Sequence, residues 1–103
     1  MTKILVGKIS EFPTAGCVMV QGKDIPIAVF RSGEKFYALE EMCPHRGGPL
    51  SEGKREGDQV TCPWHQAAFD ITTGKTLNGP VKRDLKRFQV ICQDDQLFVG
   101  DEC

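Results

Sequence analysis

Histidine, tryptophan and tyrosine are all scarce in this 103-residue chain, which has two, one and one of them. The length predicts one small domain and leaves no room for a second, cofactor-bearing catalytic domain. No apolar run approaches the roughly 20 residues of a membrane-spanning helix. The first seven residues carry one lysine and too short an apolar stretch for a secretory signal. We therefore expect a cytoplasmic protein that does not contact a membrane.

An excess of charge of either sign is missing as well. The 13 Lys and Arg residues nearly balance the 14 Asp and Glu residues, for a net charge of −1. This balance argues against nucleic acid as a partner and gives no strong electrostatic steering. The five cysteines are an odd number, so they cannot all pair within the chain. In a reducing cytosol, metal binding is the favoured use for some of them.

Short β-rich segments separated by turn residues predict the fold. These segments cover residues 3–9, 17–20, 25–30, 35–39, 88–92 and 96–99. Turn residues join several of them, and no segment shows the 3.6-residue period of a helix. The pattern predicts an all-β fold, an antiparallel sandwich or barrel. Pro26 would suit an edge position, because proline cannot donate to a β-ladder.

Glycine and proline are concentrated in the middle of the chain. Residues 43–80 hold six of the eleven glycines and four of the six prolines. These residues shape loops and let backbone approach a bound group closely, and long loops in small domains are usually functional. We therefore expect a single domain, residues 1–103, in which one elaborate loop region is built into a β scaffold.

Both histidines lie in this region, each beside a cysteine. The pairs are Cys43-Pro44-His45 and Cys62-Pro63-Trp64-His65, with sixteen residues between them. Two thiolates and two imidazoles are enough ligands to close a metal site. A structural zinc site is the simplest alternative, although zinc fingers commonly use a C-x₂₋₄-C pair followed by an H-x₃₋₅-H pair.

The motif resembles the Rieske family over residues 43–50 (CPHRGGPL) and 62–70 (CPWHQAAFD), and again over 73–75 and 78–81. This resemblance implies a Rieske-type antiparallel β sandwich or barrel, with a cluster-binding subdomain at about residues 42–81 made of two hairpin loops. It implies one [2Fe–2S] cluster, with Cys43 and Cys62 on the inner iron and His45 and His65 on the outer iron. It also places these residues around the cluster: Arg46, Gly47, Gly48, Trp64, Gln66 and Pro80.

Some of these neighbours have two interpretations. Arg46 is either part of a partner-docking rim or a solvated charge. We expect Trp64 to shield the cluster and to pack, and Pro80 to help cover it. Respiratory-chain Rieske proteins carry a disulfide between the cluster loops, and its positions here are Gly48 and Trp64.

The residues two and four positions after the second histidine predict a low reduction potential within the Rieske range. Two neutral imidazoles in place of two thiolates remove negative charge, which raises the potential above that of all-cysteine ferredoxins. High-potential members add hydrogen bonds from a serine and a tyrosine hydroxyl, which stabilise the added electron. Those positions are Ala67 and Phe69 here, and neither can donate.

The resemblance implies a one-electron carrier between a flavin-dependent reductase and a terminal oxygenase, and we expect it to be monomeric. The alternative is a small subunit of an NAD(P)H-dependent nitrite reductase. The chain alone cannot be the oxygenase, which needs a further iron bound by two histidines and a carboxylate, because both histidines are already used. We therefore predict an electron-transfer protein rather than an enzyme.

The remaining residues of note have simple structural interpretations. We expect Cys17 and Cys92 to be small core residues and Cys103 to be an exposed thiol. Residues 54–58 (KREGD) read as a solvated turn. Four aromatic residues are expected in the core rather than on an electron path: Phe36, Tyr37, Phe88 and Phe98.

Overall fold

Ten β-strands and two short 3₁₀ helices make up the regular structure that the computed structural model describes. The described residues are 3–12, 16–42, 49–63, 67–78 and 84–103. No helix among them is long and apolar enough to cross a membrane. The elements are β1 (Ile4–Lys8), η1 (Ile9–Glu11), β2 (Cys17–Gln21), β3 (Pro26–Ser32), β4 (Lys35–Glu40), η2 (Leu50–Glu52), β5 (Lys54–Glu56), β6 (Gln59–Thr61), β7 (Ala68–Asp70), β8 (Thr76–Asn78), β9 (Arg87–Gln93) and β10 (Gln96–Glu102).

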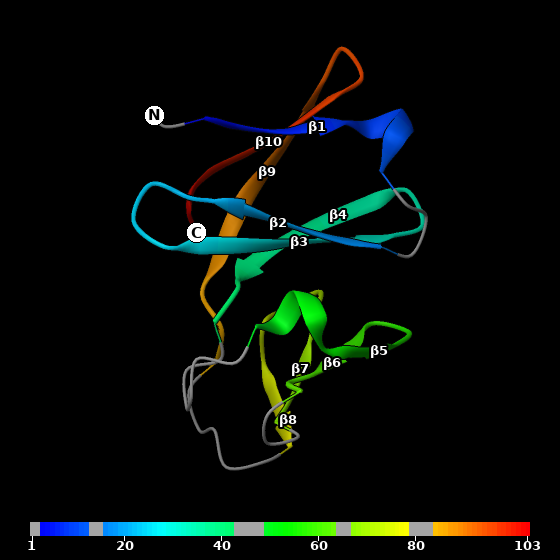
Figure 1. Ribbon diagram of the computed structural model, residues 1–103, viewed down its shortest axis with the longest axis vertical. Helices are drawn as coiled ribbons and strands as arrows, with labels where there is room; N and C mark the ends of the chain where they lie inside the picture. The colour runs from blue at the N-terminus through cyan, green and yellow to red at the C-terminus, as the bar shows by residue number, and fades with distance from the viewer. Residues whose placement is uncertain (1–2, 13–15, 43–48, 64–66, 79–83) are drawn as a thin grey trace.

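The strands form two antiparallel sheets. Six of them follow the order β1-β10-β9-β4-β3-β2 and curl into a nearly closed barrel, which confirms the predicted all-β fold. The other four follow the order β5-β6-β7-β8 and lie together at one end of the molecule's longest axis (Figure 1). The chain leaves the large sheet after β4 and returns at β9, and these two strands pair with each other.

Strands β3 and β4 separate two hydrophobic cores. Successive side chains of a strand point to opposite faces, so alternate residues can serve different cores. Ala28, Phe30 and Leu39 belong to a core shared with the four-stranded sheet, whereas Val29 and Ala38 belong to a core inside the large sheet. Burial on both faces explains why these segments are apolar almost without interruption.

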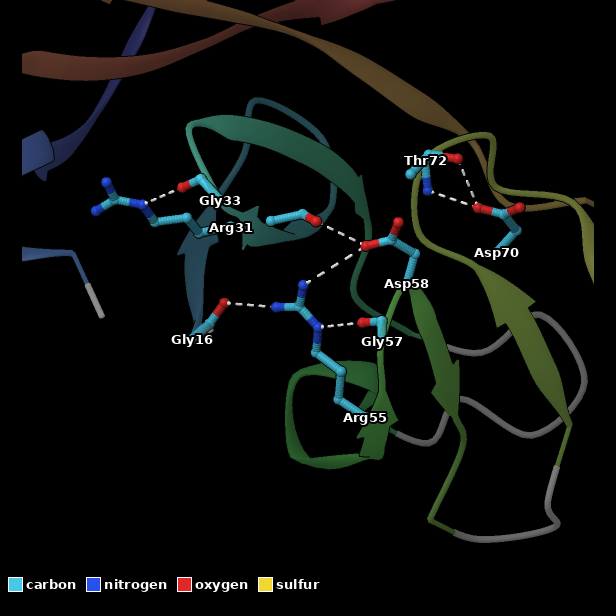
Figure 2. Close-up of polar contacts among 9 residues, drawn as sticks. Gly16, Arg31, Gly33, Arg55, Gly57, Asp58, Asp70 and Thr72 are labelled. Atoms are coloured by element: carbon cyan, nitrogen blue, oxygen red, sulfur yellow. Dashed lines mark hydrogen bonds and ion pairs between the residues drawn. The ribbon is translucent and has the colours of Figure 1, made fainter. Parts of the chain in front are cut away.

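Two arginines bond in similar ways to described residues on either side of residues 13–15, and Figure 2 shows the Arg31–Gly33, Arg55–Gly57 and Arg55–Gly16 contacts. Arg31 donates from Nε to Gly33 O (2.9 Å), and Arg55 donates from Nε to Gly57 O (2.9 Å), so each side chain closes its own turn. Each then reaches across the molecule: Nη1 of Arg31 donates to Phe12 O at 2.9 Å. Nη1 of Arg55 donates to Gly16 O at 3.4 Å. Both turns need glycine, because the backbone φ is +62° at residue 33 and +60° at residue 57.

The structure corrects three of the sequence-based predictions. Pro26 does not lie on an edge strand, since β3 runs between β2 and β4; it is tolerated as the first residue of the strand. Cys92 is exposed, near the end of β9, where Gln93 is exposed as well. Residues 54–58 are not simply a solvated turn, because they include β5 and the half-buried Arg55.

The other predictions agree more closely with the structure. Cys17 packs against the core shared with the four-stranded sheet, and Cys103 is exposed as expected. The four aromatic residues are partly buried rather than fully enclosed. Three of them pack against the cores: Phe36, Tyr37 and Phe88.

Candidate metal centre

Cys62 is the predicted ligand that the structure describes, and it follows directly after β6. Its backbone N–H donates to Ala67 O at 2.8 Å, which brings together the two ends of the predicted second ligand loop. Its side chain is 1% exposed and lies in the core with Val60 and Phe69, both fully buried. Side chains alternate between the two faces of β6, so Cys62 points into the same core as Val60. Its thiol is therefore held in place at the end of this strand.

The predicted first ligand loop is anchored in a similar way. Met42 and Pro49 form an antiparallel bridge, and the Leu50 N–H donates to Glu41 O at 2.8 Å. Leu50 is fully buried in the same core as Cys62. The end of the first loop and the start of the second therefore share one hydrophobic environment.

Gly53 allows these two segments to approach closely. A Cβ built at this position would collide with the backbone oxygen of Thr61, the residue immediately before Cys62. The Gly53 N–H also donates to Leu50 O at 3.0 Å, which closes η2 against the sheet. A residue without a side chain is thus required where η2 meets β6.

Most of the predicted site lies outside the described residues. This holds for three of the four predicted ligands, Cys43, His45 and His65, so the described part of the chain contains no group of three potential metal ligands. The predicted surroundings also lie outside it: Arg46, Gly47, Gly48, Trp64, Gln66 and Pro80.

The described residues are compatible with an iron–sulfur cluster. Cys62 forms no disulfide, and a buried thiol supplies the soft thiolate ligand that iron–sulfur clusters use. Ala67 and Phe69 are fully buried beside it and offer no side-chain donor. Their environment is therefore apolar, as the prediction of a low potential requires.

Two buried carboxylates lie where the chain crosses between the sheets. Glu40 is 7% exposed and Glu41 is 6% exposed. Glu40 Oε1 accepts the Lys86 N–H at 2.8 Å, and Glu41 Oε1 accepts the Ser51 N–H at 2.7 Å. Ser51 Oγ donates a second hydrogen bond to Glu41 Oε2. Buried carboxylates persist only when they are well hydrogen-bonded. The Glu41 contacts therefore fix the chain where it leaves the large sheet after β4, and the Glu40 contact fixes it where it returns before β9.

Two other groups near the crossing have shifted pKa values. Burial raises the pKa of the Cys17 thiol to about 12, the negative charge of Glu41 adds to this effect, and Arg55 opposes it. At the end of β7, the hydrogen bond from the Thr72 hydroxyl lowers the pKa of Asp70 (Figure 2).

Glu40 and Glu41 were not among the residues predicted to lie near the site. The available signal was their position: two acidic residues follow the apolar end of a strand and come just before the Cys43 motif. Acidic residues are rarely buried, so sequence alone places them in solvent.

Comparison with known proteins supports the assignment. A family model described as the Rieske [2Fe-2S] domain matches residues 2–89. The chain is 39% identical over 77 residues to Ferredoxin CarAc of Metapseudomonas resinovorans, covering 75% of this chain and 72% of that protein. It is 38% identical over 85 residues to the ferredoxin component of the naphthalene 1,2-dioxygenase/salicylate 5-hydroxylase systems of a Ralstonia species, covering 82% and 80%.

A solved structure agrees over nearly the whole chain. One chain of the complex of reduced oxygenase and oxidized ferredoxin in carbazole 1,9a-dioxygenase superposes with a TM-score of 0.92 at 32% identity. The match covers 98% of this chain and 95% of that one, so the two are of nearly equal length.

Proposed function

Since the chain belongs to the Rieske [2Fe–2S] family, we propose that it carries single electrons from a flavin-dependent reductase to a terminal oxygenase. The two relatives described above are a ferredoxin and the ferredoxin component of naphthalene 1,2-dioxygenase/salicylate 5-hydroxylase systems, and such components transfer electrons and are not the catalytic component. The bound cluster accepts one electron and later releases it.

The observation that carries this proposal is the full-length likeness to a chain of the oxygenase–ferredoxin complex. A putative nitrite reductase small subunit shares 20% identity with this chain, which supports a common fold and nothing more. The dioxygenase type of partner is therefore favoured over the nitrite reductase complex.

The proposed ligand set consists of Cys43 and Cys62 on the inner iron and His45 and His65 on the outer iron. The chain's described residues support it by bringing the ends of the two ligand loops into one core. We further propose that residues 1–103 act as one domain with a cluster-binding subdomain at about residues 42–81, and that the protein is a cytoplasmic monomer.

The electron-transfer role is tested by reconstitution. Purified holoprotein is mixed with a flavin-dependent reductase, NADH and a ring-hydroxylating oxygenase, and substrate turnover is measured with and without the protein. We expect turnover to rise with protein concentration and each protein molecule to support many cycles. Stable copurification with one large subunit, with no stimulation of any oxygenase, would contradict the shuttle.

The ligand set is tested with two serine variants. Cys62→Ser removes a proposed ligand, so we expect loss of the visible absorption and of acid-labile sulfide. Cys92→Ser is the matched control, because Cys92 is exposed and lies in the large sheet. We expect it to keep both signals. A Cys62→Ser protein with a full complement of cluster would exclude Cys62 as a ligand.

A further inference from the structure

Glu41 is a buried carboxylate whose hydrogen bonds within the described part of the chain come from a neutral residue. It is 6% exposed, and both of its carboxylate oxygens accept hydrogen bonds from Ser51, one from the backbone N–H and one from the hydroxyl. The structure describes no ion pair for Glu41. Arg55 acts on Cys17 together with Glu41, but its described partners are Gly57, Gly16 and Asp58.

Three observations connect the carboxylate with the core that holds Cys62, the described ligand of the proposed metal centre. In sequence, it comes two residues before Cys43. In the backbone, its carbonyl accepts the N–H of Leu50, which packs in the same core as Cys62. Electrostatically, its charge acts on Cys17, which packs against that core.

A negative charge in this position lowers the reduction potential of a nearby centre. Adding an electron to a nearby centre is opposed by a fixed negative charge, and in an apolar core water screens this repulsion weakly. The hydrogen bonds from Ser51 hold the carboxylate in place but leave its net charge intact. The same contacts tie η2 to the chain just before Cys43.

We propose that Glu41 is a positioning and redox-tuning residue: its carboxylate fixes the entry to the first ligand loop, and its charge lowers the reduction potential of the bound cluster. This inference rests on the proposed function, since it requires the cluster to be present. It adds a charge effect to the absence of hydroxyl donors at residues 67 and 69.

Anaerobic redox titration of the holoprotein tests the proposal with variants of matched size. Glu41→Gln keeps the shape and an acceptor for the Ser51 N–H, but it removes the charge. We expect its midpoint potential to rise, by up to about a tenfold change in the equilibrium for electron uptake, which equals about 59 mV for one electron. Glu41→Asp keeps the charge and should stay close to the wild-type potential, even if it is less stable.

The control is Glu52→Gln, in the same 3₁₀ helix as Ser51 but exposed, where solvent screens the charge. We expect no change in its midpoint. If Glu41→Gln does not retain a cluster, Ser51→Ala is the second test, because it removes the hydroxyl that donates to Glu41 Oε2 and leaves the charge in place; a midpoint at or below that of the wild type is expected, and a rise would contradict the proposal.

The two proposals fail in distinguishable ways. A wild-type protein without visible absorption or acid-labile sulfide would overturn the proposed function. A cluster-loaded Glu41→Gln protein with the wild-type midpoint would overturn only the tuning role, as would a Glu41→Asp protein whose potential rises as much as that of Glu41→Gln. In that case Glu41 would serve the fold alone.

Discussion

At the residue scale, the cysteines occupy contrasting environments. Cys17 is partly buried at the start of β2, while Cys92 and Cys103 are exposed. The raised pKa of Cys17 means that its thiol is neutral at physiological pH, and its partial burial further limits access to reagents. Since the thiolate is the reactive form, chemical reactivity should separate these residues.

We predict that the holoprotein has two rapidly alkylated thiols at pH 8, Cys92 and Cys103. Cys17 should react much more slowly, because it is both buried and protonated. Mass spectrometry after timed exposure to iodoacetamide measures this. The double variant Cys92→Ser/Cys103→Ser should lose the fast phase, and rapid labelling of Cys17 in that variant would contradict the prediction.

The same pKa shift has a consequence for stability. The pKa of Cys17 is raised from 9.0 to about 12 in the folded protein, so folding is favoured by this group while the thiol is protonated in both states. This contribution is complete below about pH 9 and is lost as the pH rises from 9 toward 12.

At the element scale, the hairpin between β9 and β10 depends on an unusual turn. Asp94 and Asp95 both have positive φ, at 52° and 61°, which costs energy for residues other than glycine. Among the residues that the structure describes, Asp95 has compensating contacts and Asp94 shows none: the Asp95 carboxylate accepts the Ser10 N–H at 3.1 Å and the Ser10 hydroxyl at 2.8 Å. The turn is thereby tied to η1, far away in the sequence.

We predict that Asp95→Ala destabilises the protein by about 1 kcal/mol more than Asp94→Ala, since it alone removes these hydrogen bonds. Both variants keep the positive φ, so the backbone strain cancels in the comparison. Urea denaturation of the two variants measures the difference. Equal midpoints would show that the Ser10 contacts do not contribute.

The strands were predictable because alternation of apolar residues is a local signal. Residues 17–20 and 35–39, for example, lie within β2 and β4 as expected. The order of strands is not local, which is why Pro26 was assigned to an edge. The burial of Glu41 depends on Ser51, which lies ten residues later and is brought back to it beside the Met42–Pro49 bridge, so it could not be predicted from the sequence around it. The proposed ligands follow from their pattern and stay a prediction.

At the scale of the whole molecule, the predicted ligand Cys62 follows β6 in the four-stranded sheet, which lies at one end of an elongated body. The principal extents are 40 × 27 × 18 Å, and the four-stranded sheet occupies one end of the long axis (Figure 1). A centre at such an end can approach a partner's redox group without obstruction from the large sheet. The orientation of that end depends on contacts between the two sheets.

We predict that Asp58 restrains the four-stranded sheet relative to the large one. Its carboxylate accepts the Ser32 hydroxyl at 2.7 Å and lies 4.0 Å from Arg55 Nη2. Asp58→Ala should speed hydrogen exchange of the β5–β7 amides while leaving β3 and β4 unchanged, because only the link is lost.

The matched control is Glu56→Ala, which removes a carboxylate from the same hairpin. Glu56 pairs only with Lys54, and both side chains are more than 70% exposed, so the pair contributes little. Unchanged exchange is expected for this variant. Equal acceleration in both variants would mean that the hairpin opens by itself, without the Ser32 link.

The pairing of β4 with β9 has a consequence for how such a protein can be varied. Everything between these strands is attached to the barrel at two neighbouring points, as an inserted module would be. Its length and contents can change without rerouting any strand of the barrel. A chimaera that exchanges this module between two relatives would therefore transplant the ligand loops while keeping the host barrel, provided that Glu40 and Glu41 move with it.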